Sequence, residues 1–174
     1  MKCLMPLNQR EAIAEAIEGK TYTEWGVGGT TVWLAENAHP LIPESIEHDE
    51  GWVDQVEDEA AITGALIGWD VRHCPCTPGA NATPGEEISI DADAYIAAGA
   101  SMTCDVYLID GVVRARCLDA LVETGRPMVV FIHDTQRDWY DDAIQRAVDA
   151  GFVRTDYPEG EDYPGCKLTK LTRE

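Results

Sequence analysis

The order of short apolar segments and amphipathic helical segments constrains the fold of this chain more than any other feature. The segment 105–110 is an almost continuous apolar run, which is typical of a strand covered on both faces, and we place it at the centre of a sheet. Strand and helix patterns alternate along the chain, and this alternation predicts an α/β, doubly wound, mostly parallel sheet. Strands are expected at 20–25, 41–47, 69–74, 105–110 and 128–132.

Residues that start and stop helices define the helical part of this prediction. Asn8 can cap a first helix, and Gly19 can end it. Asp49 and Glu50 suit the first turn of a later helix, and Gly125 is expected to end another. Helices are therefore expected at 8–19, 30–37, 49–66, 92–98, 114–123 and 136–150.

The last segments of the chain depart from the alternation. Strand patterns at 152–157 and 166–171 are separated by the turn-rich segment 158–165, which predicts an antiparallel hairpin at a sheet edge and about seven strands in all. The segment 75–87 contains three prolines and two glycines and is expected to be a loop. Within 75–90 the chain has its one candidate for a lid.

Length and composition are those of one ordinary domain, 1–174, with 45% hydrophobic residues. No apolar run reaches the roughly 18 to 20 residues of a membrane-spanning helix, and the N-terminus does not resemble a secretory signal. We expect a cytoplasmic protein without a membrane partner. The six cysteines lack a paired spacing and are expected to be reduced, and His73, Cys74 and Cys76 lack a fourth ligand for zinc.

The charge of the chain opposes one class of partner. Thirty-two acidic residues against 13 basic ones give a formal net charge of -19. A protein that binds nucleic acid must neutralise phosphates, so we expect no nucleic-acid partner. An acidic, solvated surface that favours solubility is the first explanation for this charge, and a cationic partner or substrate is the alternative.

The segment 24–30, Glu-Trp-Gly-Val-Gly-Gly-Thr, follows the first expected strand. In a doubly wound sheet, ligands bind beyond the carboxyl ends of the strands, and glycines let the backbone approach a ligand closely. A tight turn from strand to helix explains the same glycines equally well. A second feature is needed to decide between the two.

Glu47 ends the second expected strand, 21 residues after Gly26. At this offset a carboxylate can accept hydrogen bonds from the hydroxyls of a ribose. A nicotinamide cofactor would meet the same requirements, but its usual Gly-x-Gly-x-x-Gly pattern lacks the third glycine here. The pair predicts a site for an adenosine-type ligand.

Glu24, Gly26 and Gly28 match the Glu/Asp-x-Gly-x-Gly motif of the class I S-adenosylmethionine-dependent methyltransferases, which this chain resembles. The segments 45–49, 108–111 with Arg114, and 132–134 resemble strand ends of a subgroup of that family, so the likeness covers about residues 20 to 150. It implies a Rossmann-like fold and S-adenosylmethionine as cofactor. The implied contacts are Glu24, Gly26, Gly28, Gly29 and Thr30 with the methionine part, Glu47 with the ribose, His48 beside the adenine, and Asp110.

The likeness breaks down at the third strand, where family members often have an acidic residue near the adenine amino group. This chain has Arg72, His73 and Cys74 there. The adenine contacts are therefore not predicted by the motif. The acceptor that the resemblance implies is an oxygen or nitrogen of a small molecule or saccharide.

Asp110, His133 and Asp134 follow the fourth and fifth expected strands and should converge beside the cofactor as catalytic residues. In one interpretation His133 or Asp110 removes a proton from the acceptor. In a second, the three side chains bind a divalent cation such as Mg²⁺, as in the metal-dependent small-molecule O-methyltransferases. In a third, Asp134 and Asp110 only cap or turn the following segments.

Arg114 and Arg137 follow the same strand ends in a chain with few cations. They either bind an anionic acceptor such as a carboxylate or uronic acid, or pair with nearby carboxylates. Trp139 and Tyr140 either stack on a sugar or aromatic acceptor or pack against the sheet. Arg114, Arg137 and Tyr140 are the candidate substrate residues.

Two classes of function fit these observations. The first is the methyltransferase described above, and DNA base methylation is disfavoured because the Asp/Asn-Pro-Pro-aromatic motif is missing. The second is a non-catalytic binding or interaction module that keeps the fold, which the shortness of the chain favours.

Overall fold

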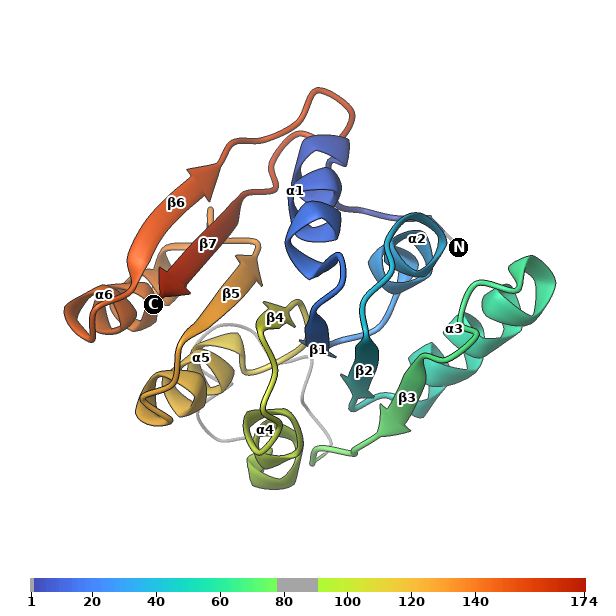
Figure 1. Ribbon diagram of the computed structural model, residues 1–174, viewed down its shortest axis with the longest axis horizontal. Coiled ribbons are helices and arrows are strands. Elements are labelled where there is room, and N and C mark those ends of the chain that lie inside the picture. The colour runs from blue at the N-terminus through green and yellow to red at the C-terminus, as the bar shows by residue number, and fades with distance from the viewer. Residues whose placement is uncertain (1, 78–90) are drawn as a thin grey trace.

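A computed structural model of the protein describes residues 2–77 and 91–174. Its strands form one seven-stranded sheet in the order β3-β2-β1-β4-β5-β7-β6 (Figure 1). The first five strands pair in parallel, whereas β7 pairs antiparallel with both β5 and β6. The predicted doubly wound α/β fold with an antiparallel hairpin at one edge is confirmed.

The elements are short, as expected for a domain of this size. The strands are β1 (Thr21–Trp25), β2 (Ile42–Glu47), β3 (Asp70–His73), β4 (Val106–Ile109), β5 (Met128–His133), β6 (Val153–Tyr157) and β7 (Leu168–Arg173). The helices are α1 (Leu7–Ile17), α2 (Gly29–Asn37), α3 (Glu50–Thr63), α4 (Asp93–Ala100), α5 (Arg114–Glu123) and α6 (Asp141–Asp149), with a 3-10 turn at Asp138–Tyr140.

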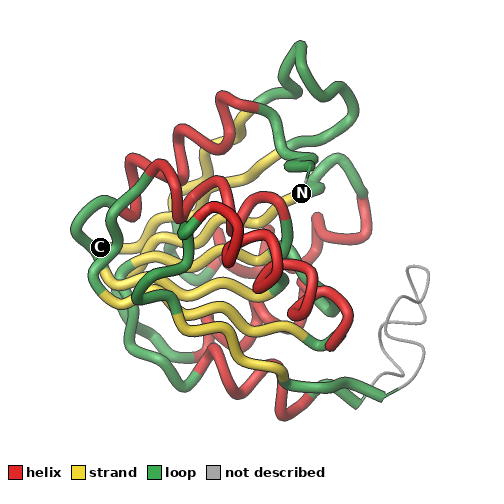
Figure 2. Tube along the Cα trace, turned by 90° about the vertical axis from the view of Figure 1, so that its right-hand side faces the viewer, coloured by secondary structure: helices red, strands yellow, loops and turns green. Residues whose placement is uncertain are grey.

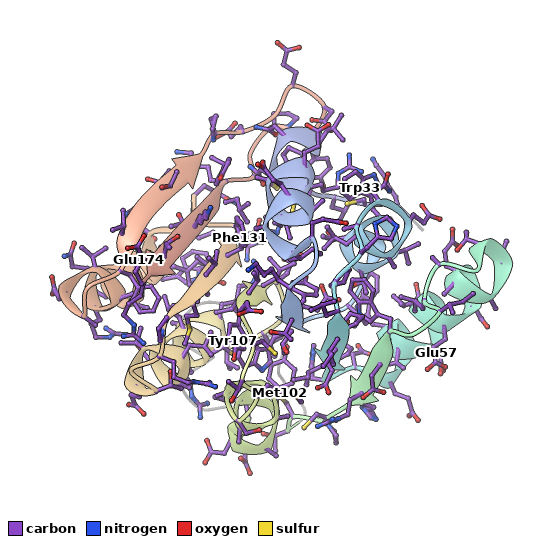
Figure 3. All side chains as sticks on the ribbon, in the orientation of Figure 1. Trp33, Glu57, Met102, Tyr107, Phe131 and Glu174 are labelled. Atoms are coloured by element: carbon purple, nitrogen blue, oxygen red, sulfur yellow. The ribbon has the colours of Figure 1, made fainter. Side chains whose placement is uncertain are left out.

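Helices cover both faces of the sheet (Figure 2). On one face α4, α5 and α6 pack on a large apolar core that includes Tyr107, and on the other α1 and α2 pack on a core that includes Phe131. Both side chains are fully buried (Figure 3). All four residues of β4 are buried, which confirms that this strand lies at the centre of the sheet.

Several element boundaries differ from the predictions by a few residues, as for the last strand, which begins at Leu168 and not at residue 166. The first helix begins at Leu7, and the backbone carbonyl of Pro6 accepts the first hydrogen bonds, so Asn8 is not the cap. The third helix ends at Thr63 because Gly64 adopts the left-handed conformation. Residues 136–137 are not helical but belong to the turn after β5, where Gln136 Oε1 accepts a hydrogen bond from the Lys167 backbone.

Residues 78–90 of the expected loop and lid lie outside the described residues. None of the described helices is long and apolar enough to cross a membrane. The six cysteines are not joined in disulfides, and Cys117 and Cys166 are buried.

Candidate functional site

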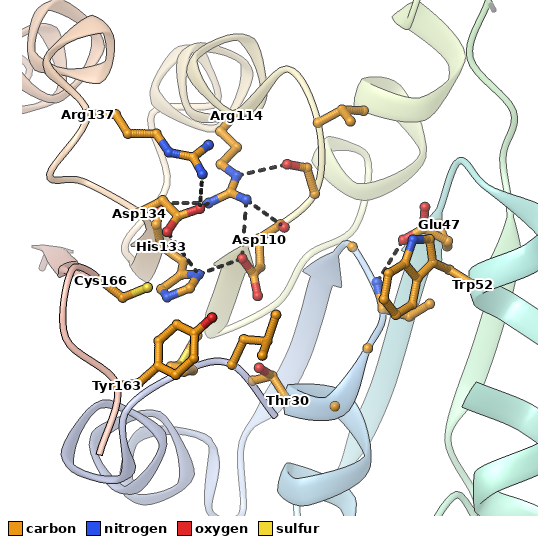
Figure 4. Close-up of a pocket in the computed structure, with 18 of the residues that line it drawn as sticks. Thr30, Glu47, Trp52, Asp110, Arg114, His133, Asp134, Arg137, Tyr163 and Cys166 are labelled. Atoms are coloured by element: carbon orange, nitrogen blue, oxygen red, sulfur yellow. Dashed lines mark hydrogen bonds and ion pairs between the residues drawn. The ribbon is translucent and has the colours of Figure 1, made fainter. Parts of the chain in front are cut away.

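A cavity of about 550 Å³ opens at the carboxyl ends of the parallel strands. The strand order reverses here, since β2 and β3 lie on one side of β1 whereas β4 and β5 lie on the other. The cavity wall is formed by the loop after β1, the end of β2, the segments after β4 and β5, the first residues of the chain and the segment before β7 (Figure 4).

The three glycines of the loop after β1 have different roles. Gly26 has a φ of +95°, and a Cβ there would lie 2.5 Å from the backbone nitrogen of Gly111. A Cβ on Gly29 would collide with the backbone of Lys2. A Cβ on Gly28 would have no described atom within 4 Å, and Gly28 lines the cavity. Gly28 is therefore the position where a ligand can approach the backbone.

Glu24 does not line the cavity. Its side chain is fully buried and accepts hydrogen bonds from the hydroxyls of Tyr22 and Ser45. The structure thus corrects the expectation that Glu24 faces a cofactor, because its side chain lies inside the fold and not among the residues that line the cavity. Burial raises the pKa of Glu24 to about 7, although hydrogen bonds from Ser45 and Tyr22 oppose this shift.

This carboxylate should make stability depend on pH. The folded state holds the proton of Glu24 up to about pH 7, whereas the unfolded chain releases it near the ordinary value of 4.5. Its contribution is complete below that value and is lost as the pH rises through 7, by roughly 3 kcal/mol. Glu24→Gln, which stays neutral and can bond both hydroxyls, should lose less stability than wild type between pH 5 and 8 in chemical denaturation. Equal losses would contradict this assignment.

Glu47 lies in the wall of the cavity at the end of β2. One carboxylate oxygen accepts a hydrogen bond from the Val27 backbone at 2.8 Å, and the other accepts from the backbones of His48 and Asp49. These bonds tie the end of β2 to the glycine loop and fix the direction of the carboxylate. Thr30, whose hydroxyl lies 3.4 Å from Cys3 Sγ, lines the same cavity.

The cavity beside Glu47 is bounded by two rings. His48 lines it, with Nδ1 lying 2.6 Å from a Glu47 oxygen. Trp52, in the first turn of α3, also lines it with 42% of its surface exposed (Figure 4). The sequence pattern did not identify Trp52 as a site residue, although a large aromatic residue in the first turn of the helix after β2 could have indicated it. None of the residues of the third strand end, Arg72, His73 and Cys74, is among those that line the cavity.

Asp110 and His133 form a pair on the opposite side of the cavity. Asp110 Oδ1 lies 2.8 Å from His133 Nδ1, whereas His133 Nε2 is buried without a hydrogen-bond partner in the described part of the chain. Burial opposes ionisation of both groups, but their mutual attraction outweighs it. The pKa of Asp110 is therefore lowered and that of His133 raised.

Two arginines hold the carboxylate of Asp134. Arg114 Nη1 lies 3.2 Å from Asp134 Oδ2, and Arg137 Nη2 lies 3.0 Å from the same oxygen. Arg114 is buried and also donates to the backbone carbonyls of Asp110, Gly111 and His133. Its donors are thus used within the protein, and the alternative of local pairing holds for Arg114. Arg137 pairs too, but 42% of its side chain stays exposed at the cavity.

Asp134 does not cap the following turn. It has a φ of +64°, and its carboxylate accepts from Gln136 Nε2 and from the arginines. Tyr140 is buried but still lines the cavity, whereas the half-exposed Trp139 is not among its lining residues. The structure therefore brings the expected strand-end residues to one cavity, with Glu24 outside it.

Comparisons with solved structures identify proteins that share this architecture. A methyltransferase-like protein from Silicibacter pomeroyi superposes with a TM-score of 0.68 over 99% of this chain and 89% of its own, at 21% identity. Magnesium protoporphyrin IX methyltransferase from Synechocystis, solved with S-adenosylmethionine bound, gives 0.63 over 96% and 79%, at 10% identity. The chain has the class I S-adenosylmethionine-dependent methyltransferase fold.

An rRNA methylase from Streptococcus thermophilus shares this methyltransferase fold, with a TM-score of 0.56 over 99% of both chains at 13% identity. The fold by itself therefore does not exclude a nucleic-acid acceptor. No protein-family model matches the sequence, and no curated protein matches it.

Two further segments complete the wall of the cavity, and the sequence spacing could not predict that they lie there. Lys2, Leu4 and Met5 line the cavity from the N-terminal segment. Tyr163 and Cys166 line it from the segment before β7. The pairing of β7 with β5 brings the second segment to the strand ends, and both segments lie far from those ends in the sequence, so no local pattern marks them.

The cation site expected at Asp110, His133 and Asp134 is not assembled in this form. Asp110 is bonded to His133 Nδ1, and Arg114 lies against both carboxylates, which disfavours a magnesium ion between them. Among the described residues, His133, Asp134 and Cys166 instead offer ligand atoms within 4.8 Å of one another.

Proposed function

We propose that the protein is an S-adenosylmethionine-dependent methyltransferase that acts on an oxygen or nitrogen of a small molecule or saccharide. The main observation behind this proposal is that the carboxylate of Glu47 lies in the wall of the cavity, where the backbone of Gly28 is also accessible to a ligand. A carboxylate at the end of β2 is suited to two ribose hydroxyls, and a backbone without Cβ is suited to close approach.

The chain offers a contact for each part of the cofactor. Gly28 and Thr30 would lie along the methionine part, and Glu47 would hold the ribose. His48 and Trp52 would flank the adenine, which fits two rings that border the cavity beside Glu47. S-adenosylmethionine supplies an electrophilic methyl group when it is bound.

We assign the activation of the acceptor to Asp110, His133 and Asp134. These residues lie across the cavity from Glu47, on the side where the ends of β4 and β5 meet. Asp110 holds the His133 ring, so Nε2 is the ring atom that remains available. Arg137, with part of its guanidinium exposed at the cavity, would pair with an anionic group of the acceptor.

Charge favours a small acceptor over a nucleic acid. The chain carries a net charge of -19, so a phosphate backbone approaching the cavity would meet repulsion over most of the surface. Lys2 and Arg137 are cations at the cavity itself, and they can attract a small anionic group without a broad basic surface.

Calorimetry with S-adenosylmethionine and its demethylated product tests the proposal. Wild type should bind both, and Glu47→Ala should bind each about 10- to 100-fold more weakly, because hydrogen bonds to a charged group are lost. Glu50→Ala is the matched control and should bind like wild type, because Glu50 is a nearby acidic residue at the start of α3 that does not line the cavity.

The binding results for wild type and for Glu47→Ala test different parts of the proposal. If wild type binds neither compound, the methyltransferase proposal is wrong and a binding module of another kind is indicated. If Glu47→Ala binds as tightly as wild type, the ribose contact has been assigned to the wrong residue. Thermal denaturation of both variants shows whether lost binding follows from lost folding.

A further inference from the structure

Three side chains of metal-ligating type meet in the cavity wall from two distant parts of the chain. His133 ends β5, Asp134 follows it, and Cys166 lies shortly before β7. One potential ligand atom of each lies within 4.8 Å of the other two, and all three residues are buried (Figure 4).

His133 contributes a buried ring nitrogen whose hydrogen-bonding capacity is not satisfied in this group. Its side chain is 93% buried, and Nε2 has no hydrogen-bond partner among the described residues. Asp110 holds Nδ1 at 2.8 Å on one side of the ring, and Cys166 lies on the other side (Figure 4). A buried polar atom without a partner is costly, and a bound ion would satisfy it.

We propose that His133 Nε2, Asp134 and Cys166 Sγ bind a divalent transition-metal ion of the zinc type. Imidazole and thiolate select such ions over magnesium, and three protein ligands leave a fourth position open to the cavity. Asp110 on Nδ1 provides the carboxylate that usually orients a metal-binding histidine. Arg114 and Arg137 hold Asp134 Oδ2, and Asp134 Oδ1 accepts a hydrogen bond from Gln136 Nε2 that the ion would displace.

The charges of the site can accommodate the ion. Asp110, Asp134 and the Cys166 thiolate carry three negative charges, against the two positive charges of Arg114 and Arg137. Binding of the metal requires a thiolate at Cys166 and a neutral Nε2 at His133, so the thiol proton, and the Nε2 proton where His133 is charged, leave to solvent as the ion binds. Once the Cys166 proton has been released and His133 is neutral, these side chains together carry a net negative charge that the bound ion offsets.

The place of this ion suggests what it does, and this step rests on the proposed methyltransferase function. An acceptor hydroxyl at the open position would lose its proton to solvent more readily, because the metal lowers its pKa. The acceptor oxygen then forms a bond to the methyl carbon. The bond from that carbon to sulfur breaks, and its electron pair stays on sulfur.

Titration of the metal-free protein with Co²⁺ tests the site. Wild type should develop visible cobalt bands and a thiolate-to-cobalt charge-transfer band in the near ultraviolet, at one ion per chain. Cys166→Ser should lose the charge-transfer band, and Asp110→Asn should bind Co²⁺ about 10- to 100-fold more weakly. The double variant Cys74→Ser/Cys76→Ser is the control and should keep the band.

No charge-transfer band in wild type would overturn the proposal. A band that survives Cys166→Ser, or that disappears in the Cys74/Cys76 control, would overturn it as well. Circular dichroism establishes that each variant is folded, and Cys166→Ala provides a second truncation if serine proves disruptive. Calorimetry with S-adenosylmethionine on the same metal-free protein keeps failure of the metal site distinct from failure of the methyltransferase assignment.

Discussion

Replacing Gly28 by valine should abolish the binding of S-adenosylmethionine while the protein stays folded. A Cβ at this position would meet no described protein atom within 4 Å, and the φ of 173° is extended backbone that any residue adopts. The added side chain would therefore occupy the cavity, where the ligand must approach the backbone, and not the protein interior. We expect binding to weaken more than about 100-fold, equivalent to some 3 kcal/mol.

A size series makes this prediction specific. Calorimetry on Gly28→Ala, Gly28→Ser and Gly28→Val should show affinity falling as the side chain grows. Serine is a useful member because it is favoured at a helix N-cap, the position that Gly28 occupies before α2. Full affinity in the valine variant would show that no ligand contacts this loop.

Gly26→Ala, two residues earlier, should instead destabilise the fold strongly. The φ of +95° is unfavourable for alanine, and its Cβ would lie within 2.8 Å of backbone atoms of Asp110 and Gly111. The clash can be relieved only if the ends of β1 and β4 separate, and these central strands carry the core. We expect a loss of about 4 kcal/mol or more in the free energy of unfolding.

Chemical denaturation of Gly26→Ala beside Gly28→Ala measures this difference. The Gly28 variant should stay within about 1 kcal/mol of wild type, since it changes only the helix N-cap. Similar stability of the two variants would contradict the distinct roles that the structure assigns to these glycines.

The local sequence pattern was sufficient for most of the framework. The apolar run at β4 predicted a central strand, and Gly19 and Gly125 marked helix ends that the structure confirms with positive φ values. The prediction failed where a distant residue intervened. Gln136 was expected in a helix, but it lies in the turn after β5, where its side chain accepts a hydrogen bond from the backbone of Lys167.

The roles of individual site residues depended on neighbours far away in the chain. Glu24 and Glu47 are both acidic residues at strand ends, yet Glu24 is bonded inside the fold by Tyr22 and Ser45, whereas Glu47 lines the cavity. In β1 the side chains alternate between the two faces, but only the packed helices decide which face is closed. No spacing rule distinguishes the two carboxylates.

The sequence by itself determined the strand and helix pattern and the position of the glycine loop, because both follow from local periodicity. It also determined which strand-end residues line one cavity, because parallel strands end on the same side of a sheet. Only the tertiary structure decided that Asp110 orients His133, that the donors of Arg114 are used internally, and that Cys166 reaches His133 and Asp134. Apart from the bonds of Arg114 to Asp110 and Gly111, those contacts join residues 19 or more positions apart, and they depend on the pairing of β7 with β5 and of β4 with β5.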